Sequence, residues 1–552
     1  MKQKLKIGIL LNSPFIPAWE FKILQVINNS EYAEIKLLIR NEIRQPVSEN
    51  RKKKLAHSIL KLLDNTDRLI FKSKVDYDRK KDVNELFGSI PELDLSFVSG
   101  SLNDGRVNEI ARYDLDIILK FDSYSSNEEI LKTAKYGIWS NSFDNNNFLN
   151  GIKSGFWEVV SGRSITNSAL TIAKTSNDLT DIVFNCWEST CPFSISINRN
   201  NVLWRTSLFM PRLIRGLYNY GDPFLERQIS KFKSMEHQGD LYPRSCTLHT
   251  ASKYVANYFR QALRMINKKL LYSDDFDWQV LFEIQKGRNG LSNDFSSFRK
   301  LVSPKEIFWA DPFILAKNDN YFIFVEEYIY KAYKAHIAVL KLDKEGNLLS
   351  SDKIIERPYH MSYPFIFNLE NVYYMIPETG KNKTIELYRC TDFPYKWEFV
   401  KNIMANVSAV DTTLFFYNNK CWLFTSIDQT GNISGNSTEL FLFYSDDIFS
   451  DKWKNHPDNP IVSDARTARP AGKLFIHEDK IYRPSQNCTG RYGRGFNISQ
   501  VTKLTEYEYS ETFISETEPG WDSKLKGIHT LNSDGDLTVI DVYSYRKRFK
   551  IH

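Results

Sequence analysis

Two patterns of hydrophobic and polar residues divide the chain. In the first half, apolar runs alternate with stretches of helical spacing, as in residues 4–11, 18–30 and 33–40. A strand, a helix and a second strand within about forty residues form a βαβ unit, which implies a parallel sheet. We therefore predict a Rossmann-like, doubly wound α/β domain over residues 1–204. Further expected strands are 93–100, 114–121 and 137–143, and expected helices are 48–85 and 128–136.

Residues 205–275 are predicted to be a helical connector. The segment 251–272 has apolar residues at the spacing of one helix face, and it also carries a basic set. We expect this helix to pack between the two halves, with a role at a membrane surface as the alternative. The apolar residues are Val255, Tyr258, Phe259, Leu263, Ile266 and Leu270, and the basic ones are Arg260, Arg264, Lys268 and Lys269.

The second half repeats one unit five times: a polar head, an apolar strand, a turn rich in Asn, Asp or Gly, and a second apolar strand. The turns read KNDN, NLEN, YNNK, HEDK and SDGD, and such residues are preferred in hairpins. A period near fifty with several strands per unit is typical of a propeller blade, so residues 276–552 are predicted to form an all-β five-bladed propeller. The heads step by 52, 48, 60 and 58 residues and are Asp311, Tyr363, Asp411, Ala471 and His529.

The repeat also predicts a site. The innermost strand of each blade lines the central channel, so equivalent heads converge at one mouth of the propeller. Carboxylates, a His, a Tyr and an Arg around one cavity suit a polyhydroxylated ligand. The candidate substrate-binding residues are Tyr363, Glu327 with Glu326 as its alternative, Glu378, Arg469, Arg483 and His529.

Two segments of the first half read DLDIILKFDSYSSNEEILKTAKYGIWSNSFDN and GFWEVVSGRSITNSALTIAKTSNDLTDIV. They resemble the N-formyltransferase family, and more closely a divergent bacterial branch of that fold. The family places an Asn, a His and an Asp at the reacting centre, because formyl transfer needs a base and a donor at the formyl carbonyl. Asp178 matches the family Asp as a candidate catalytic residue. Ser142 and Phe143 stand where the His is expected, with Asn141 and Asp144 close by. An active site would use 10-formyltetrahydrofolate, and the alternative is a retained fold used for binding or docking.

The motifs WADPFI and AVDTTLF resemble five-bladed glycosidases of the arabinanase and β-xylosidase type. The resemblance implies that Asp311 and Asp411 are catalytic, as the base and the orienting carboxylate. The general acid does not carry over, because ARPAGKLF has Arg469 where that family has a Glu. Inverting hydrolysis needs both an acid and a base, so a transferase is favoured over a hydrolase.

Longer motifs cover nearly all of the second half: HMSYPFIF, YYMIPET, SAVDTTLF, WLFTS, ARPAGKLF and YRPSQNCTGRYG. They resemble the N-terminal region of glucosamine inositolphosphorylceramide transferases and its bacterial relatives. This resemblance implies sugar or glycolipid biology without assigning a reaction.

Charge and cysteine content exclude several classes. The net charge of +6 is small for 552 residues and the basic and acidic residues alternate, so nucleic acid is not an expected partner. The six cysteines form no CxxC pair, so neither a metal site nor a disulfide framework is predicted. Residues 1–15 are better explained by a first strand than by a signal peptide, and no window has the apolar length of a transmembrane helix. We therefore expect a cytoplasmic protein, with peripheral membrane contact left open.

Together these patterns predict a carbohydrate-active protein of bacterial surface-glycan or glycolipid assembly. In this hypothesis the propeller binds an anionic or amino sugar, presented as a sugar, a sugar nucleotide or a glycolipid. The N-terminal domain would modify that sugar or position a nucleotide-linked donor. Two alternatives are an N-formyltransferase acting on an amino-sugar nucleotide and a non-catalytic sugar-binding scaffold.

Overall fold

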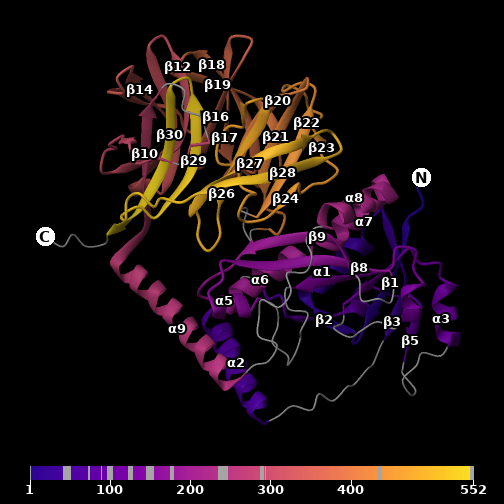
Figure 1. The fold of residues 1–552 in the computed structure, drawn as a ribbon. Helices are drawn as coiled ribbons and strands as arrows, with labels where there is room; N and C mark the ends of the chain where they lie inside the picture. Colours follow the sequence, from indigo (N-terminus) through magenta and orange to yellow (C-terminus); the bar gives the residue numbers. More distant parts are fainter. Residues whose placement is uncertain are drawn as a thin grey trace. The chain divides into compact units, whose positions relative to one another are not determined.

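The chain divides into two compact units, Met1–Ala262 and Leu263–His552, and Figure 1 labels many of their helices and strands. The structure is a computed structural model. It describes residues 2–40, 51–72, 75–88, 90–95, 104–121, 128–143, 155–174, 180–233, 247–285, 291–292, 294–431 and 438–547.

The N-terminal unit is built on a seven-stranded sheet in the order β5-β3-β1-β6-β7-β8-β9. The pairs from β5 to β7 are parallel, whereas β8 and β9 are antiparallel additions. Counted along the chain, the five parallel strands have the spatial order 3-2-1-4-5, which is found in doubly wound sheets. The strands are β1 (Leu5–Leu11), β3 (Ala33–Arg40), β5 (Glu92–Asp94), β6 (Ile117–Lys120), β7 (Ile138–Phe143), β8 (Ile165–Ala173) and β9 (Thr180–Ser189), with a separate pair β2 (Phe15–Pro17) and β4 (Lys80–Asp82).

Both faces of this sheet carry apolar side chains, because successive residues of a strand point to opposite sides. Ile9 belongs to a core that includes residues of α1 and α7, and its neighbour Leu10 belongs to a core that includes Ile110 of α3 and Ile130 of α4. Helices α7 and α8 fall in the segment predicted to be a connector, and the Phe209 ring of α7 packs 4.6 Å from that of Phe184 on β9. The helices are α1 (Ala18–Asn28), α2 (Arg51–Ile70), α3 (Asp104–Ala111), α4 (Glu128–Leu131), α5 (Trp157–Ser161), α6 (Ile195–Thr206), α7 (Phe209–Tyr220), α8 (Asp222–Phe232) and α9 (Leu248–Leu271).

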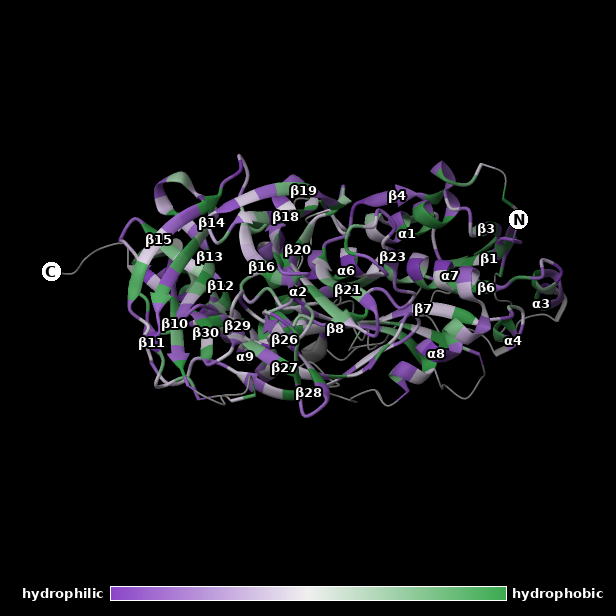
Figure 2. Cartoon of the chain, turned by 90° about the horizontal axis from the view of Figure 1, so that it is seen from above, coloured by the Kyte–Doolittle hydropathy of each residue, from purple (hydrophilic) through white to green (hydrophobic). Residues whose placement is uncertain are grey.

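The described strands of the C-terminal unit form five antiparallel sheets, which confirms the five-bladed propeller. Bands of hydrophobic and hydrophilic residues follow one another along these strands (Figure 2). The first four sheets are β12–β15 (Ile307–Lys317, Asn320–Ile329, Lys334–Asp343, Leu348–Ile355), β16–β19 (Ser362–Leu369, Val372–Thr379, Thr384–Asp392, Lys396–Ala405), β20–β24 (Ala409–Tyr417, Lys420–Ile427, Glu439–Ser445, Lys454–Asn455, Val462–Ser463) and β25–β28 (Phe475–His477, Lys480–Asn487, Gly495–Leu504, Tyr509–Thr517).

The fifth sheet joins the two ends of the propeller sequence. It has the order β11-β10-β30-β29, so the first strands of the propeller pair with its last hairpin. In the β10–β30 ladder Trp278 lies opposite Tyr543. This pairing closes the ring of blades and explains why five sequence repeats need an additional strand pair from before the first one. The strands are β10 (Tyr272–Ile284), β11 (Arg299–Lys300), β29 (Gly527–Asp534) and β30 (Leu537–Lys547).

The repeated heads share a backbone irregularity. Asp311, Tyr363 and Asp411 have φ of 49°, 42° and 52°. These values lie in the left-handed region, which residues other than glycine rarely adopt. Each lies at a register shift in its inner strand, and the equivalent shift in β29 lies between Ile528 and Leu531. A bulge inserts a residue and re-aims the neighbouring side chains. The repeat unit therefore places the same bulge at the head of each of these strands.

Among the described residues, no helix combines the length and the apolar character that crossing a bilayer requires.

Candidate functional site

Two of the blade heads, Asp311 and His529, border a cavity of about 280 Å³. Its floor is polar and its walls include four aromatic rings. The volume is at the lower end of small-molecule sites, which suits a single sugar ring. The lining residues are Trp278, Phe308, Asp311, Glu326, Tyr328, His360, Ser362, Glu378, Arg469, Tyr492 and His529.

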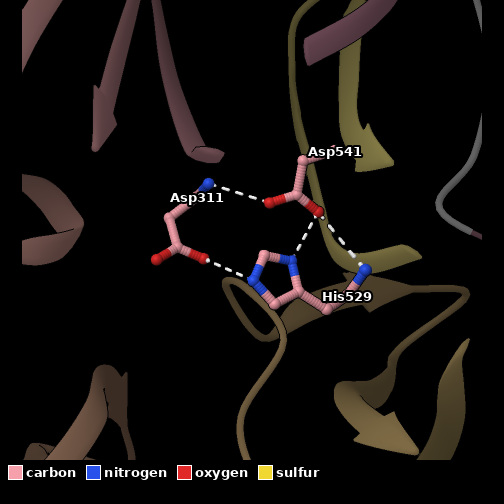
Figure 3. Close-up of side chains that lie close together, drawn as sticks. All are labelled: Asp311, His529 and Asp541. Atoms are coloured by element: carbon pink, nitrogen blue, oxygen red, sulfur yellow. Dashed lines mark hydrogen bonds and ion pairs between the residues drawn. The ribbon is translucent and has the colours of Figure 1, made fainter. Parts of the chain in front are cut away.

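Asp311, His529 and Asp541 form a buried chain at the floor (Figure 3). His529 Nδ1 lies 2.6 Å from Asp541 Oδ1, and His529 Nε2 lies 3.4 Å from Asp311 Oδ1. Asp541 also accepts hydrogen bonds from the backbone N–H groups of Asp311, at 2.8 Å, and Thr530, at 2.9 Å. The imidazole is thus held between two carboxylates, and its orientation is fixed from the β30 side.

The same three residues place one possible ligand atom each within 4.8 Å of one another, as a small metal site would require. Both ring nitrogens of His529 already face a carboxylate oxygen. A cation would have to replace one of these contacts. The geometry therefore explains the cluster without an ion.

Arg469 and Asp411 form a second buried pair. Arg469 Nε donates to Asp411 Oδ2 at 2.5 Å, and Gln486 Nε2 donates to the same oxygen at 2.7 Å. The guanidinium also lies 3.9 Å from a carboxylate oxygen of Glu378 and stacks over the Tyr492 ring at 4.9 Å. Burial opposes the charged form of Arg469, but Asp411 and Glu378 raise its pKa. Asp411 is therefore engaged by Arg469 and Gln486 and does not line the cavity.

Aromatic rings flank the polar floor. The Trp278 ring stacks on the His529 imidazole with centroids 3.9 Å apart and an interplanar angle of 22°. The Tyr492 ring stands at 90° to the same imidazole. Flat aromatic faces beside polar groups provide apolar contact for the C–H faces of a small polar ligand while the floor supplies hydrogen bonds.

The carboxyls of the floor outnumber its fixed cations. Burial, with further contributions from Glu326, Asp411 and Asp541, raises the pKa of Asp311 well above its usual range. Burial and Asp411 likewise raise the pKa of Glu378, although Arg469 opposes the shift. Glu326 pairs with His360 at 3.3 Å. Asp311 and Glu378 are therefore the carboxyls whose ionisation the surrounding protein disfavours.

Tyr363 supports the floor from behind and does not line the cavity. Its hydroxyl lies 2.8 Å from Thr413 Oγ1 and accepts a hydrogen bond from the Gly472 N–H at 2.8 Å. Its own N–H donates to Asp311 Oδ2 at 3.2 Å. The second head therefore ties the first, third and fourth blades together.

Two further residues predicted to contact the ligand, Glu327 and Arg483, also lie away from the cavity. Glu327 points away from the cavity, where it contacts His336 Nε2 at 3.0 Å and accepts from Trp309 Nε1 at 2.9 Å, so its alternative Glu326 is the lining residue. Burial raises the pKa of Glu327, yet these two partners bring it below its usual range. Arg483 is buried against Glu511, with Nη2–Oε1 at 2.7 Å, and its side chain braces the fourth blade.

Asp178 and Asp144 lie outside the described residues. Ser142 and Phe143, which stand where the family His is expected, are buried near the end of β7. The candidate formyltransferase centre therefore stays a prediction. In the propeller, Trp278 and Asp541 are among the site residues that the repeat pattern does not identify. Asp541 carried a signal, since a lone carboxylate within the apolar run TVIDVY is unusual unless it is paired, whereas Trp278 precedes the repeats and carried none.

Fold and site together define the C-terminal unit as a five-bladed β-propeller with a polar, aromatic-walled cavity at the heads of its inner strands. Residues 296–538 match the family described as glucosamine inositolphosphorylceramide transferase 1, N-terminal.

Curated relatives agree with this match. Glucosamine inositolphosphorylceramide transferase 1 of Oryza sativa subsp. japonica is 36% identical over 211 residues, which are 38% of this chain and 28% of the relative. The Arabidopsis thaliana protein of the same name is 31% identical over 210 residues, covering 38% of this chain and 27% of the relative. The chain thus matches less than a third of the length of these relatives.

Solved structures similar to this chain include a family 117 glycoside hydrolase of Zobellia galactanivorans, with 11% identity, a TM-score of 0.32, and coverage of 49% of this chain and 91% of that chain. A Bacillus subtilis arabinanase has 14% identity, a TM-score of 0.31, and coverage of 42% and 92%.

Proposed function

We propose that this protein acts in glycolipid or surface-glycan assembly, and that its propeller cavity binds a sugar carrying a protonated amine. The observation that carries the proposal is the excess of buried carboxyls at the cavity floor. Asp411 is matched by Arg469, and Asp541 by the imidazole of His529. Asp311 and Glu378 remain without a full positive counterpart, and burial, together with the neighbouring carboxylates, raises the pKa of both.

A cation bound between these two carboxyls would lower the cost of ionising both of them. A carboxylated sugar would instead add negative charge to the floor, so the anionic ligand considered from the sequence is disfavoured. An ammonium group also donates three hydrogen bonds, whereas a carboxylate only accepts them. The names of the curated relatives, which include glucosamine, support an amino sugar as the ligand class.

Transfer is favoured over hydrolysis as the associated chemistry. An inverting glycosidase needs a general acid and a general base on opposite sides of the bond. In the fourth blade the residue at the acid position is Arg469, a permanent cation bound to Asp411. The relatives named as transferases support a role in moving or presenting a sugar.

We further propose that the N-terminal unit is a formyltransferase-like domain and that it acts on the same sugar as the propeller. The strand order 3-2-1-4-5 supports this, because doubly wound sheets bind ligands outside the carboxyl ends of their strands at the point where the order reverses. An assay with 10-formyltetrahydrofolate and an amino-sugar nucleotide tests the idea. Formyl transfer that is lost in Asp178→Ala supports it, and no product with any amino sugar contradicts it.

Calorimetric titration of the full chain with four methyl glycosides tests the propeller site: glucosaminide, N-acetylglucosaminide, glucoside and glucuronide. The glucosaminide is expected to bind at least about tenfold more tightly than the glucoside, because a buried charge-assisted contact contributes roughly 1.5–3 kcal/mol. The glucuronide is expected to bind most weakly. Equal affinity for the glucosaminide and the glucoside would refute the amine assignment.

A matched pair of variants locates the contact. Glu378→Gln is expected to remove the preference for the amine while leaving the glucoside affinity unchanged. Glu398→Gln, on an exposed strand of the same blade, is the control and should behave as the wild type. Loss of the preference in both variants would exclude a direct contact through Glu378.

A further inference from the structure

Helix α9 presents an apolar stripe to solvent. Phe259, Leu263, Ile266 and Leu270 follow one another at spacings of four, three and four residues, which places them on one side of an α-helix. Their exposed fractions lie between 47% and 61%. Exposing such a row to water is unfavourable, because removing apolar surface from water lowers the free energy.

Another side of the same helix holds it on the N-terminal unit. Tyr258 is buried and its hydroxyl donates to Asp67 of α2. Asn257 and Gln261 donate to the carbonyls of Val160 and Val159 of α5, each at 3.1 Å. These contacts fix the rotation of the helix, so the apolar stripe is a different surface from the packed one.

The charge on α9 is entirely positive. Its 24 residues contain Lys253, Arg260, Arg264, Lys268 and Lys269 and no Asp or Glu. Within the described part of the chain, Arg264 and Lys269 have no ion-pair partner. An apolar stripe that is flanked by basic residues, with no acidic residue on the helix, complements a surface with an apolar layer beneath an anionic one.

Helix α2, which contacts α9 through Asp67, has a similar exposed row. Leu55, Ile59, Leu62 and Leu69 are exposed, whereas Ala56, Leu60 and Leu63 pack into the core that also contains Tyr258. The contacting helices α2 and α9 therefore each combine one packed face with one exposed apolar face.

We propose that α9 is a membrane-docking helix that lies in the interface of an anionic bilayer, with its Phe259–Leu270 stripe among the acyl chains. The basic side chains reach the lipid headgroups, because long cationic side chains can extend to the polar layer while their stems stay on the apolar surface. The contact is peripheral and salt-sensitive. It is independent of what the propeller cavity binds.

Sedimentation of the full chain with sucrose-loaded vesicles tests this proposal. Vesicles of phosphatidylcholine alone are compared with vesicles that also contain phosphatidylserine, at low and high salt. Binding is expected only to the anionic vesicles and is expected to weaken as salt rises. No binding to either vesicle, or equal binding to both, would overturn the proposal.

Two double variants divide the contact into its parts. Arg264→Gln/Lys269→Gln is expected to weaken binding roughly 25-fold, at about fivefold per neutralised charge. Leu263→Gln/Ile266→Gln is expected to weaken it at least about tenfold at unchanged charge. Because these positions are exposed and Gln is a good helix former, both variants should keep the circular dichroism and melting temperature of the wild type.

Matched controls come from exposed positions of the propeller. Lys344→Gln/Lys524→Gln removes the same charge, and Phe513→Gln/Ile514→Gln removes a comparable apolar area. Both should bind vesicles as the wild type does, and an equal loss in the controls would overturn the assignment to α9.

The alternative partner for the apolar stripe of α9 is a second copy of this chain. A stable dimer in light scattering that dissociates in Leu263→Gln/Ile266→Gln would also overturn the proposal.

Discussion

Asp541 accepts a hydrogen bond from the backbone N–H of Asp311, 230 residues earlier in the chain, at 2.8 Å. One residue lies in the last strand of the propeller and the other is the head of the first repeat. This contact joins the closing sheet to the first blade at the floor of the cavity. The same carboxylate orients His529, so ring closure and site geometry depend on one side chain.

Asp541→Ala is expected to destabilise the propeller by ~3–5 kcal/mol, because it leaves buried N–H groups and an imidazole without their acceptor. Urea unfolding followed by tryptophan fluorescence measures the change. Asp534→Ala is the matched control, since Asp534 accepts from the Ala316 N–H at 2.8 Å in an exposed position. It is expected to cost less than about 1 kcal/mol, and equal effects would contradict the special role of Asp541.

Gly472 allows the fourth blade to approach the fifth. Its φ is 135°, and an added Cβ would lie 2.1 Å from the carbonyl oxygen of Leu531. Gly472→Ala is therefore expected to cost ~2–4 kcal/mol through strain and overlap with backbone. Gly520→Ala, where nothing lies within 4 Å of the new Cβ, is expected to change the free energy of unfolding by about 0.5 kcal/mol or less. Thermal unfolding of the two variants separates these outcomes.

The Arg469–Asp411 pair provides a third test. Arg469→Met is expected to destabilise the protein by ~3–5 kcal/mol, because it leaves a carboxylate with 1% exposure uncompensated. Adding Asp411→Asn should recover part of that loss, since the double variant buries no unpaired charge. Free energies of unfolding for both single variants and the double variant complete the cycle. Additive losses would mean that the two side chains do not stabilise each other.

The repeat made most of the propeller predictable. Heads at a period near fifty identify the inner strands, and equivalent residues of a closed ring must meet at one mouth. Asp311 and His529 were found in this way, and both line the cavity. Tyr363 and Asp411 share the head position but lie behind the floor, because each is held by partners from another blade.

Sequence periodicity did not show which of two adjacent strand residues faces the cavity. Glu326 and Glu327 are adjacent, so they point to opposite sides, and the sequence does not contain the cross-strand contact between Glu327 and His336 that settles which one is inward. Arg483 has the same difficulty, since Glu511 lies on another hairpin of the blade. Trp278 was missed because closure by β10 depends on tertiary pairing.

The pH dependence of stability gives the final prediction. Burial raises the pKa values of Asp311 and Glu378 from ordinary values of 3.8 and 4.5. Between the ordinary and the raised values the folded protein holds protons that the unfolded chain has released, so these groups make stability fall as pH increases. The stability difference between the wild type and Asp311→Asn/Glu378→Gln isolates their effect from that of other carboxylates. As pH rises from about 4, the free energy of unfolding of the variant is expected to increase relative to that of the wild type. The increase is ~1.4 kcal/mol for each unit by which a pKa is raised. Melting temperatures across this range measure the gain, and a constant difference would show that both carboxyls are ionised in the empty cavity at the same pH as in the unfolded chain.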